Sequence, residues 1–467
     1  MSMGTLSMVA DAVDGRLIGA DRSFAAVSTD TRTLQTGELF FALHGDRYDA
    51  AEFVAEAARR GAAGAVVDGR QQGDLPQIEV GDTRDALGAL ARTWRGRFEL
   101  PVIGVTGSNG KTTVKEMIAA ILRAEFDAAN GDSAVLVTSG NFNNEVGLPL
   151  TVLRLEAEHR AAIFEMGAAR PKDIEYLADI AAPTIGVVTN AGKAHLEGFG
   201  NEETVAATKG ELFEALARGD VAVVNHDDKF ASFWRELAAP AEIRTFGLTN
   251  GATYKAVDIR EIHANESGIE FTMQTPGGEI AIRLPMAGRH NVANALAAAA
   301  AADAAGASAA AIRVSLAGAR NIAGRLMELS GVGGVVLFDD SYNANPVSVA
   351  AAIDFLAERA GETWLILGDM AELGPDGPGL HHAAGERAHR LGVDRLFTYG
   401  ALARNAAAGF GVGATTYDDL DTLAAALRGD AHAGVSALVK GSRCMGLDRL
   451  VALLREDEHV LSGSEET

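Results

Sequence analysis

Cysteine is nearly absent from this chain of 467 residues, which contains only Cys444. A single thiol excludes an intramolecular disulfide and a cluster of thiolate metal ligands, and it is typical of proteins in a reducing compartment. Positive charge is also scarce, because 41 Lys and Arg stand against 63 Asp and Glu, a net charge of −22. Nucleic-acid backbones are bound by clustered Lys and Arg, so this balance argues against a nucleic-acid partner. A small anionic ligand needs only a local positive site and remains compatible with it.

Long hydrophobic runs are also missing. The most apolar stretch, residues 294–312, is rich in alanine and is interrupted by Asp303, Gly306 and Ser308. Alanine favours helix but partitions weakly into lipid, so this stretch predicts a helix packed within the protein. The N-terminus lacks the basic residues and apolar core of an export signal. We therefore expect a soluble, cytoplasmic protein with no membrane insertion.

The length and texture of the chain predict three domains of the α/β class. Short mixed elements fill the first hundred residues, and buried strands then alternate with helical segments, a pattern typical of a parallel sheet with crossover helices. We expect an N-terminal domain at 1–100, a central domain at 101–322 and a C-terminal domain at 323–467. Within the central domain, residues 253–284 alternate with a period of two, which predicts antiparallel strands. The predicted buried strands of the central and C-terminal domains span 102–105, 162–166, 185–189, 221–225, 335–338, 364–367, 396–399 and 437–439.

The most informative segment reads GVTGSNGKTT over residues 104–113, between an apolar run and a helical pattern. A strand, a glycine-rich turn and a helix N-terminus together bind nucleotide phosphates through backbone amides, a lysine and a hydroxyl that ligates Mg²⁺. The usual first glycine of this motif is replaced by Val105, and Gly107 opens the loop instead. We therefore predict a nucleoside triphosphate site of a distinct branch of ATP users. Its residues are Gly107, Ser108, Asn109, Gly110, Lys111, Thr112 and Thr113.

Three further residues are candidates for chemistry. Glu165 and His195 follow predicted parallel strands, and ligands bind at the carboxyl ends of such strands. Glu165 is either a metal ligand or a solvated strand end, and His195 is either a ligand or a packed histidine. Lys209 lies in a predicted helix and is either a surface residue or a buried amine with a lowered pKa. A neutral buried amine reacts with carbon dioxide to give a carbamate, which is an anionic ligand for Mg²⁺.

Taken together, these residues resemble the Mur ligases of bacterial cell-wall synthesis. The resemblance includes the phosphate loop, Glu165, His195, the segment KGE at 209–211, GRHNVAN at 288–294 and GRL at 324–326. Further segments resemble the branch of the family that adds D-alanyl-D-alanine to UDP-N-acetylmuramoyl-tripeptide. They are GNFNNEVGLPL at 140–150, DSYNANP at 340–346, LGDMAELG at 367–374 and VKGSR at 439–443, and the match runs in order from 28 to about 450.

The resemblance implies an ATP-dependent amide ligase that works through an acyl phosphate and yields the pentapeptide precursor of peptidoglycan. It implies a UDP-binding N-terminal domain, a central phosphate-loop ATPase domain and a Rossmann-like C-terminal domain, and we expect the protein to be a monomer. The expected nucleotide contacts are Lys111, Asn294, Arg325 and Asp340. Two Mg²⁺ ions would be held by Thr112, Glu165, His195 and carbamylated Lys209, and Lys111, Glu165, His195 and Lys209 would be the catalytic residues.

Substrate contacts also follow from the resemblance. The segment STDTR at 28–32 resembles the family's uridine site, and a capped turn between strands remains the alternative. Residues 46–53 depart from the family's usual pattern because they lack its Gly-His pair, so no contact is assigned to them. The expected substrate residues are Ser28, Thr29, Asp30, Arg32, Asn141, Asn144, Tyr342, Asn343 and Asn345.

Two kinds of alternative remain open at this point. A related Mur ligase that adds one amino acid, or a ligase like folylpolyglutamate synthetase, would share the loop and the carbamate. The third-residue ligases carry an Asp-Asn-Pro-Arg-like segment, which this chain lacks. A non-catalytic nucleotide-binding regulator would keep Lys111 and Thr112 but would not need Glu165, His195 and Lys209 together.

Overall fold

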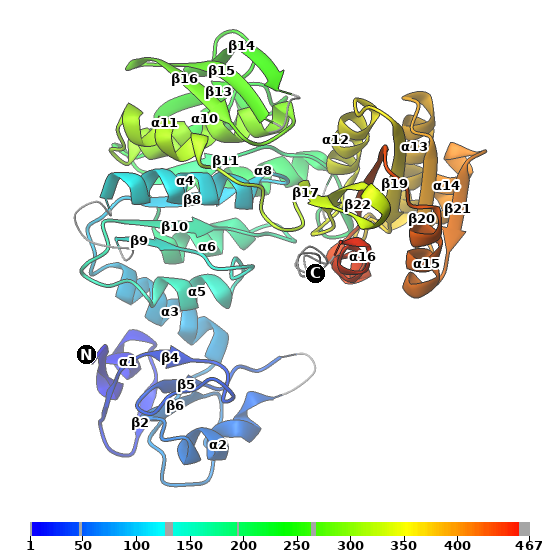
Figure 1. The fold of residues 1–467 in the computed structure, drawn as a ribbon. Coiled ribbons are helices and arrows are strands. Elements are labelled where there is room, and N and C mark those ends of the chain that lie inside the picture. The colour runs from blue at the N-terminus through cyan, green and yellow to red at the C-terminus, as the bar shows by residue number, and fades with distance from the viewer. Residues whose placement is uncertain (1, 46–48, 127–133, 194–195, 263–267, 457–467) are drawn as a thin grey trace, which may run out of the picture. The chain divides into compact units, whose positions relative to one another are not determined.

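The computed structural model describes residues 2–45, 49–126, 134–193, 196–262 and 268–456. The chain forms two compact units, one of residues 1–190 with 207–319 and one of residues 191–206 with 320–467. Both contain sheets with helices beside them (Figure 1), so the expected α/β class with mostly parallel sheets is confirmed.

The N-terminal part of the first unit is a five-stranded sheet with the order β2-β7-β6-β5-β4, next to a two-stranded pair β1-β3. Its central strand β6 is fully buried, and Phe40 and Phe41 of β5 pack beside it. The strands are β1 Gly4–Thr5, β2 Arg16–Ile18, β3 Ser23–Phe24, β4 Val27–Ser28, β5 Leu39–Phe41, β6 Gly64–Val67 and β7 Gln77–Glu79; the helices are α1 Leu6–Ala12, α2 Val54–Arg59 and α3 Thr83–Arg95.

A nine-stranded sheet forms the rest of the first unit, with the order β16-β15-β14-β13-β12-β11-β8-β10-β9. Strands β9 to β14 and β8 run parallel, and β15 and β16 add an antiparallel flank. The strands are β8 Val102–Thr106, β9 Val135–Val137, β10 Ala161–Glu165, β11 Ile185–Val188, β12 Val221–Asn225, β13 Glu242–Gly247, β14 Tyr254–Ile262, β15 Gly268–Thr275 and β16 Gly278–Leu284.

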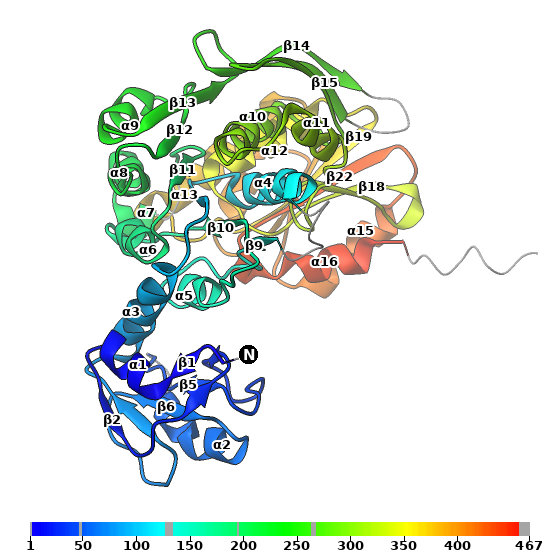
Figure 2. The ribbon, with the colours of Figure 1, turned by 90° about the vertical axis from the view of Figure 1, so that its left-hand side faces the viewer.

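Helices cover both faces of this sheet (Figure 2), with α4, α10 and α11 on one face and α6, α8 and α9 on the other. The helices that follow α3 in chain order are α4 Lys111–Phe126, α5 Gly147–Val152, α6 Asp173–Ala181, α7 Leu196–Phe199, α8 Glu202–Glu214, α9 Ala231–Leu237, α10 Arg289–Ala304 and α11 Ala309–Ala317.

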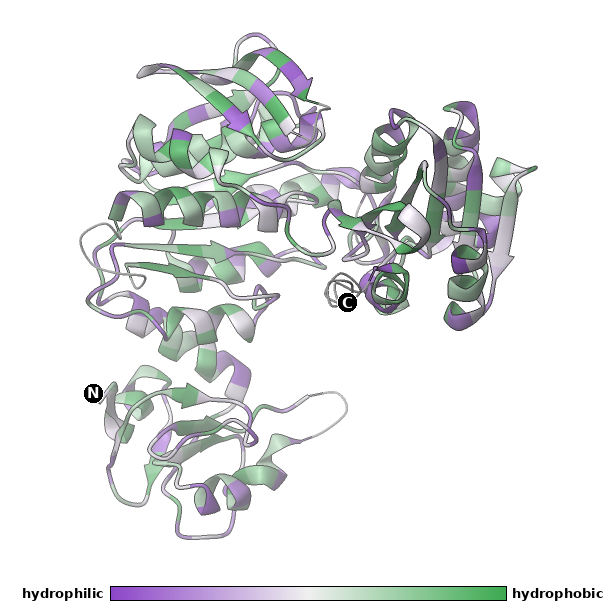
Figure 3. Cartoon of the chain, in the orientation of Figure 1, coloured by the Kyte–Doolittle hydropathy of each residue, from purple (hydrophilic) through white to green (hydrophobic). Residues whose placement is uncertain are grey.

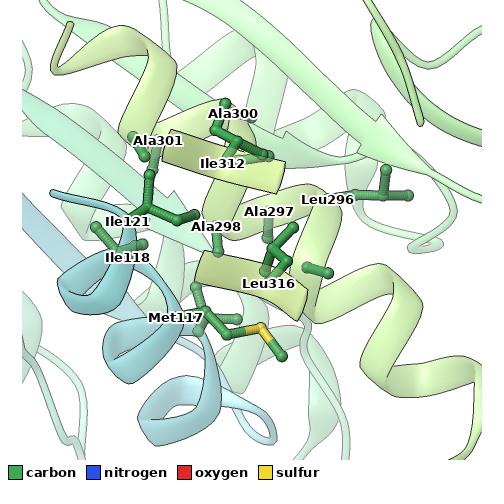
Figure 4. Packing of buried hydrophobic residues seen from close by; sticks show 14 of the residues in the cluster. Met117, Ile118, Ile121, Leu296, Ala297, Ala298, Ala300, Ala301, Ile312 and Leu316 are labelled. Atoms are coloured by element: carbon green, nitrogen blue, oxygen red, sulfur yellow. The ribbon is translucent and has the colours of Figure 1, made fainter. Parts of the chain in front are cut away.

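The alanine-rich stretch is packed in protein, as predicted, and it forms two helices. Residues 295–302 of α10 are all buried, because small alanines let α4 and α11 approach closely. Figure 4 shows Met117, Ile118 and Ile121 of α4 against the alanines of α10 and against Ile312 and Leu316 of α11. Gly306, at φ +97°, ends the first helix, and the Ser308 hydroxyl accepts from the Ala311 amide to begin the second.

The second unit is built on a six-stranded sheet with the order β17-β18-β22-β19-β20-β21, parallel except for β17. Helices α12 to α15 connect its strands, and α16 follows β22. The strands are β17 Met327–Ser330, β18 Val336–Asp340, β19 Glu362–Gly368, β20 Arg395–Tyr399, β21 Ala414–Tyr417 and β22 Val435–Lys440; the helices are α12 Pro346–Ala357, α13 Gly377–Arg390, α14 Arg404–Phe410, α15 Leu420–Asp430 and α16 Leu447–Leu454.

Every predicted buried strand is present within a few residues of its predicted bounds, whereas β9, β13, β17 and β21 of the same domains were not predicted. The period of two at 253–284 corresponds to β14, β15 and β16, where hydrophobic and hydrophilic residues alternate (Figure 3). No helix among the described residues is long and apolar enough to span a membrane.

Candidate active site

The order of strands places a ligand site at the carboxyl end of β8. Strand β8 lies between β10 and β11, and all three run parallel. The chain leaves β8 for β9 and β10 on one side and then crosses to β11 on the other side. Such a reversal opens a crevice at the carboxyl ends of the strands, where open α/β sheets bind ligands.

The loop after β8 has a backbone that only glycine adopts easily. Gly107 has φ +141° and Gly110 has φ +81°. A Cβ on Gly107 would lie 2.0 Å from Thr189 Oγ1, so any side chain there would displace the loop. The loop leads directly into α4, whose first residue is Lys111, and the Lys111 ammonium donates to the Gly107 carbonyl at 2.6 Å. Glycine turn, lysine and helix N-terminus thus have the arrangement that binds phosphates.

Two residues at the end of β11 hold this loop in place. The Asn109 amide donates to Asn190 Oδ1 at 2.9 Å, and the Ser108 amide donates to the Asn190 carbonyl at 2.9 Å. The Thr189 hydroxyl donates to the Asn109 carbonyl at 2.6 Å. This role of Thr189 and Asn190 was not predicted from the sequence; their position at the carboxyl end of a predicted strand was the available signal.

Glu165 ends β10 and is buried, with a side chain 4% exposed. Its carboxylate accepts from Thr112 Oγ1 at 2.9 Å and from Asn143 Nδ2 at 2.8 Å. The interpretation of Glu165 as a solvated strand end is therefore wrong. The structure joins the hydroxyl of the phosphate loop to the carboxylate of the neighbouring strand, and both are oxygen donors of the kind that Mg²⁺ prefers.

Lys115 belongs to the same cluster, although sequence analysis did not identify it. Its side chain is 1% exposed, and its ammonium lies 3.9 Å from Glu165 Oε2. It donates to the Thr138 carbonyl at 2.8 Å, and the Thr138 hydroxyl accepts from the Glu165 amide at 3.1 Å. One feature of the sequence could have indicated a buried lysine here: Lys115 lies in the apolar helical stripe that continues through Ile118 and Leu122.

Lys209 lies on α8 and is 3% exposed, so the alternative of a surface lysine is wrong. Burial, and then the positive charge of Lys111, lower the pKa of its ammonium to about 7.

The neighbouring Glu211 has a different role, because its two oxygens accept from the Lys172 and Glu175 amides at 2.9 Å each. It thereby caps the N-terminus of α6, and burial raises the pKa of its carboxyl.

Asn294 lies beside the phosphate loop. A Cβ on Gly110 would be 2.6 Å from Asn294 Oδ1, and Asn294 Nδ2 donates to Asn291 Oδ1 at 3.1 Å. Asn144, one of the expected substrate residues, accepts from the Gly147 amide at 2.9 Å at the start of α5, whereas Asn141 is exposed.

His195 lies outside the described residues. Among the residues that the structure does describe, no group of three or more His, Cys, Asp or Glu is arranged to hold a metal ion. The predicted ligands include the Thr112 hydroxyl and a carbamylated lysine, which are not among these four residue types, so the metal site stays a prediction.

In the second unit, five of the predicted residues gather near the carboxyl end of β18. Arg325 lies over the Tyr342 ring at 4.4 Å, and Asp340 accepts from Lys440 Nζ at 2.5 Å. Asn345 forms a capping box with Ser348 at the start of α12, which is a helix-stabilising role. The remaining predicted residue, Asn343, is exposed in the same loop.

The predicted uridine segment forms a tight turn after β4. Asp30 accepts from the Arg32 amide and pairs with its guanidinium, which lowers the pKa of the Asp30 carboxyl to about 2. The Ser28 hydroxyl donates to the Asp30 carbonyl at 3.2 Å, and Thr29 is half-buried beside it. These contacts fit a capped turn, and they leave a substrate role as a prediction. Of residues 46–53, the first three lie outside the described residues, and Asp49 caps the short turn of helix at Ala50–Phe53.

Comparison with known proteins gives consistent results over the whole chain. The family model for the Mur ligase middle domain matches residues 105–302, and that for the Mur ligase glutamate ligase domain matches residues 324–443. The UDP-N-acetylmuramoyl-tripeptide–D-alanyl-D-alanine ligase of Escherichia coli strain K12 is 40% identical over 456 residues, which cover 97% of this chain and 98% of that one.

Solved structures agree with these matches. A crystal structure of MurF from Acinetobacter baumannii superposes with a TM-score of 0.89 and 33% identity, over 96% of this chain and 98% of that one. The structure of the MurF ligase from Thermotoga maritima in complex with ADP has a TM-score of 0.82 and 27% identity, over 92% and 96% of the two chains. With matches of this extent and identity, the chain belongs to the Mur ligase family.

Proposed function

We infer that the protein is an ATP-dependent ligase that adds D-alanyl-D-alanine to UDP-N-acetylmuramoyl-tripeptide and so forms the pentapeptide precursor of peptidoglycan. The relative named for this activity matches over nearly the whole chain. The observation that carries the chemistry is the bond between the phosphate-loop hydroxyl of Thr112 and the buried Glu165 carboxylate, with the buried Lys209 amine beside Lys111. A nucleotide-binding regulator has no need for this combination.

The reaction needs ATP because a carboxylate is a poor acyl donor. A carboxylate oxygen of the tripeptide attacks the γ-phosphorus of ATP, the bond to ADP breaks, and an acyl phosphate forms. The amine of the dipeptide then attacks the acyl carbon and loses a proton, and inorganic phosphate leaves as the amide forms. Two anions must meet in the first step, so the protein must supply positive charge and hold both reactants in line.

We propose that Lys111, the loop amides of residues 107–113 and the N-terminus of α4 hold the ATP phosphates. The positive φ angles at Gly107 and Gly110 and the clamp by Asn190 support this, because they keep the loop open and rigid. Asn294, beside Gly110, would contact the nucleotide from α10. We assign Arg325 and Asp340 to the nucleotide as well, on the resemblance of their segments.

Magnesium fits the donor set around Glu165. The Thr112 hydroxyl and the Glu165 carboxylate are hard oxygen donors 2.9 Å apart at the phosphate loop. We propose that two Mg²⁺ ions are held by Thr112, Glu165, His195 and carbamylated Lys209. Bound there, Mg²⁺ would neutralise charge between the phosphate and the carboxylate.

The carbamate on Lys209 would form by attack of its neutral amine on carbon dioxide, with loss of one proton. Its burial and the nearby Lys111 charge both favour the neutral amine, and a carbamate would replace a buried cation by an anion beside Lys111.

We assign the remaining substrate contacts from the resemblance. Ser28, Thr29, Asp30 and Arg32 would contact the UDP end, Asn141 and Asn144 the muramoyl peptide, and Tyr342, Asn343 and Asn345 the dipeptide. The division into domains at 1–100, 101–322 and 323–467, the cytoplasmic location and the monomeric state stay predictions.

The test is phosphate release with ATP, Mg²⁺ and UDP-N-acetylmuramoyl-tripeptide, with and without D-alanyl-D-alanine. We expect strong stimulation by the dipeptide and a product heavier by that unit. Stimulation by a single amino acid would reassign the protein to another Mur ligase. Slow hydrolysis of ATP at a rate that does not depend on any peptide would instead support a nucleotide-binding regulator.

A further inference from the structure

A buried lysine that the mechanism above does not use connects two parts of the second unit. Lys440 is the last residue of β22 and its side chain is 3% exposed. Asp340 is the last residue of the parallel neighbour β18, and the two residues are partners in the strand register. The Lys440 ammonium donates to Asp340 Oδ2 at 2.5 Å. Both side chains therefore stand at the carboxyl edge of the sheet, where ligands bind in such folds.

The same ammonium makes a second contact three residues further along. Lys440 Nζ donates to the Asn343 carbonyl at 3.0 Å. One cation thus holds both ends of the loop 340–343, which leads from β18 towards α12. Asp340 is assigned above to the nucleotide and Asn343 to the dipeptide, so this loop carries residues of both sites.

The rest of the loop is held by neutral donors. Asp339 Oδ1 accepts from the Ser341 amide and hydroxyl, and Asp339 Oδ2 accepts from the Gly324 amide at 3.0 Å. A buried ion pair is costly to desolvate, and replacing both of its members by apolar side chains of similar volume is often neutral for stability. The fold by itself therefore does not call for an ion pair at positions 340 and 440.

We propose that Lys440 is a positioning residue, which fixes the nucleotide residue Asp340 and the dipeptide residue Asn343 relative to each other and so couples binding of the two substrates. The inference rests on the proposed function. Loss of the cation would let the loop shift, and a shift of about 1 Å at a reacting group costs up to ~100-fold in rate.

The test compares Lys440→Met, Asp340→Asn and the double variant in the ligation assay. We expect Lys440→Met to raise the KM for ATP and the KM for the dipeptide, each by about tenfold, as a partial loss of positioning. Asp340→Asn should raise both KM values in the wild-type background. In the Lys440→Met background it should raise only the KM for ATP, because the link to Asn343 is already lost.

Arg404→Met is the matched control, because it breaks an exposed ion pair with Asp418 in the same unit and should leave both KM values unchanged. Thermal unfolding of each variant separates folding from positioning, and the isosteric Asp340→Asn variant still tests the link through the dipeptide KM if Lys440→Met does not fold. Equal effects of Asp340→Asn in both backgrounds, or an unchanged dipeptide KM, would overturn the coupling while the proposed function stands. A wild-type protein without dipeptide-dependent ligation would overturn the proposed function and this inference with it.

Discussion

At the scale of single residues, charge at the phosphate loop is arranged by protein side chains. Lys111, Lys115 and Lys209 each bring positive charge or a basic amine towards the carboxyl end of β8, and Glu165 brings one buried carboxylate. Hydrogen bonds to Thr138, Asn143 and Thr112 hold Lys115 and Glu165 in place. Such preorganised charge costs no reorganisation at the moment of reaction, which is the main way that phosphoryl-transfer sites gain rate.

Replacing Lys209 by alanine removes the amine that would become a carbamate. We expect ligation to fall by ~100-fold or more, since removal of one preorganised electrostatic group has effects of that order. A short-chain carboxylic acid added to Lys209→Ala should restore part of the rate, because it supplies the missing anionic oxygens. Lys255→Ala, which changes a lysine on β14, serves as the control. Activity of Lys209→Ala equal to wild type would refute the carbamate.

Replacing Lys115 by methionine removes the cation that lies 3.9 Å from the buried Glu165 carboxylate. We expect the free energy of unfolding to fall by ~3 kcal/mol, the usual effect of removing one partner of a buried pair. The double variant Lys115→Met/Glu165→Gln should recover much of this loss, because no buried charge is then left over. Urea denaturation measures all three proteins. Glu116→Gln, which removes the exposed partner of Lys115, should change stability far less.

At the scale of elements, the motifs of the second unit mostly hold loops to helices. The segment LGDMAELG crosses the end of β19, where Asp369 accepts from the Leu402 and Ala403 amides at the turn before α14. His381 of α13 is fully buried and accepts from the Met370 amide at 2.9 Å. The LGDMAELG segment therefore helps to identify the family, but Asp369 and Met370 within it serve to hold the fold together.

His381 makes the stability of this region depend on pH. Burial lowers the pKa of its imidazole, against the smaller opposing effects of the Gly377 carbonyl and Asp369. The folded protein therefore protonates His381 only at a lower pH than the unfolded chain, in which a histidine takes up a proton below about pH 6.5. Stability is therefore fully present above that pH and is lost as the pH falls. In thermal unfolding between pH 7.5 and 5.5, we expect His381→Gln to show a shallower loss than wild type.

The matched control for this prediction is the next residue in the chain. His382 is about half exposed and lies 3.6 Å from Glu386. His382→Gln should keep the wild-type pH dependence, because this side chain is about half exposed and lies outside the buried surroundings of His381. The same slope for wild type and His381→Gln would mean that another group controls the acid sensitivity.

At the scale of the whole molecule, the proposed substrate contacts are distributed over segments far apart in the sequence. The nucleotide phosphates are assigned to the loop after β8, the UDP end to the turn after β4, and the dipeptide to the loop after β18. A substitution in one of these segments can weaken binding of one substrate and leave binding of the others intact. Binding of each substrate can therefore be measured separately.

Asp340→Ala tests this separation. We expect it to weaken the use of ATP about tenfold or more, because it removes a nucleotide contact and leaves Lys440 as an uncompensated buried cation. Binding of UDP-N-acetylmuramoyl-tripeptide, measured by calorimetry without ATP, should stay close to wild type. Equal loss of both would indicate a misfolded protein, which circular dichroism would reveal.

The sequence alone determined the α/β class, the strands around the phosphate loop and the family. Buried strands are continuous apolar runs, and the phosphate loop is formed by residues adjacent in the chain. Both can therefore be predicted from the order of residues alone. The edge strands β9 and β21 are short and partly exposed, and their formation depends on pairing with neighbours. That is why they were missed.

Only the tertiary structure decided which polar residues meet. Thr112, Asn143 and Glu165 are separated by up to 53 positions in the chain, and no periodicity indicates that they share one hydrogen-bonded cluster. It also decided that Lys115 and Lys209 are buried and that Lys440 bridges two segments. The physical reason is that the pKa, the charge balance and the cost of burying a lysine depend on groups brought close by folding, whereas the tendency to form a strand or a phosphate loop is carried by adjacent residues.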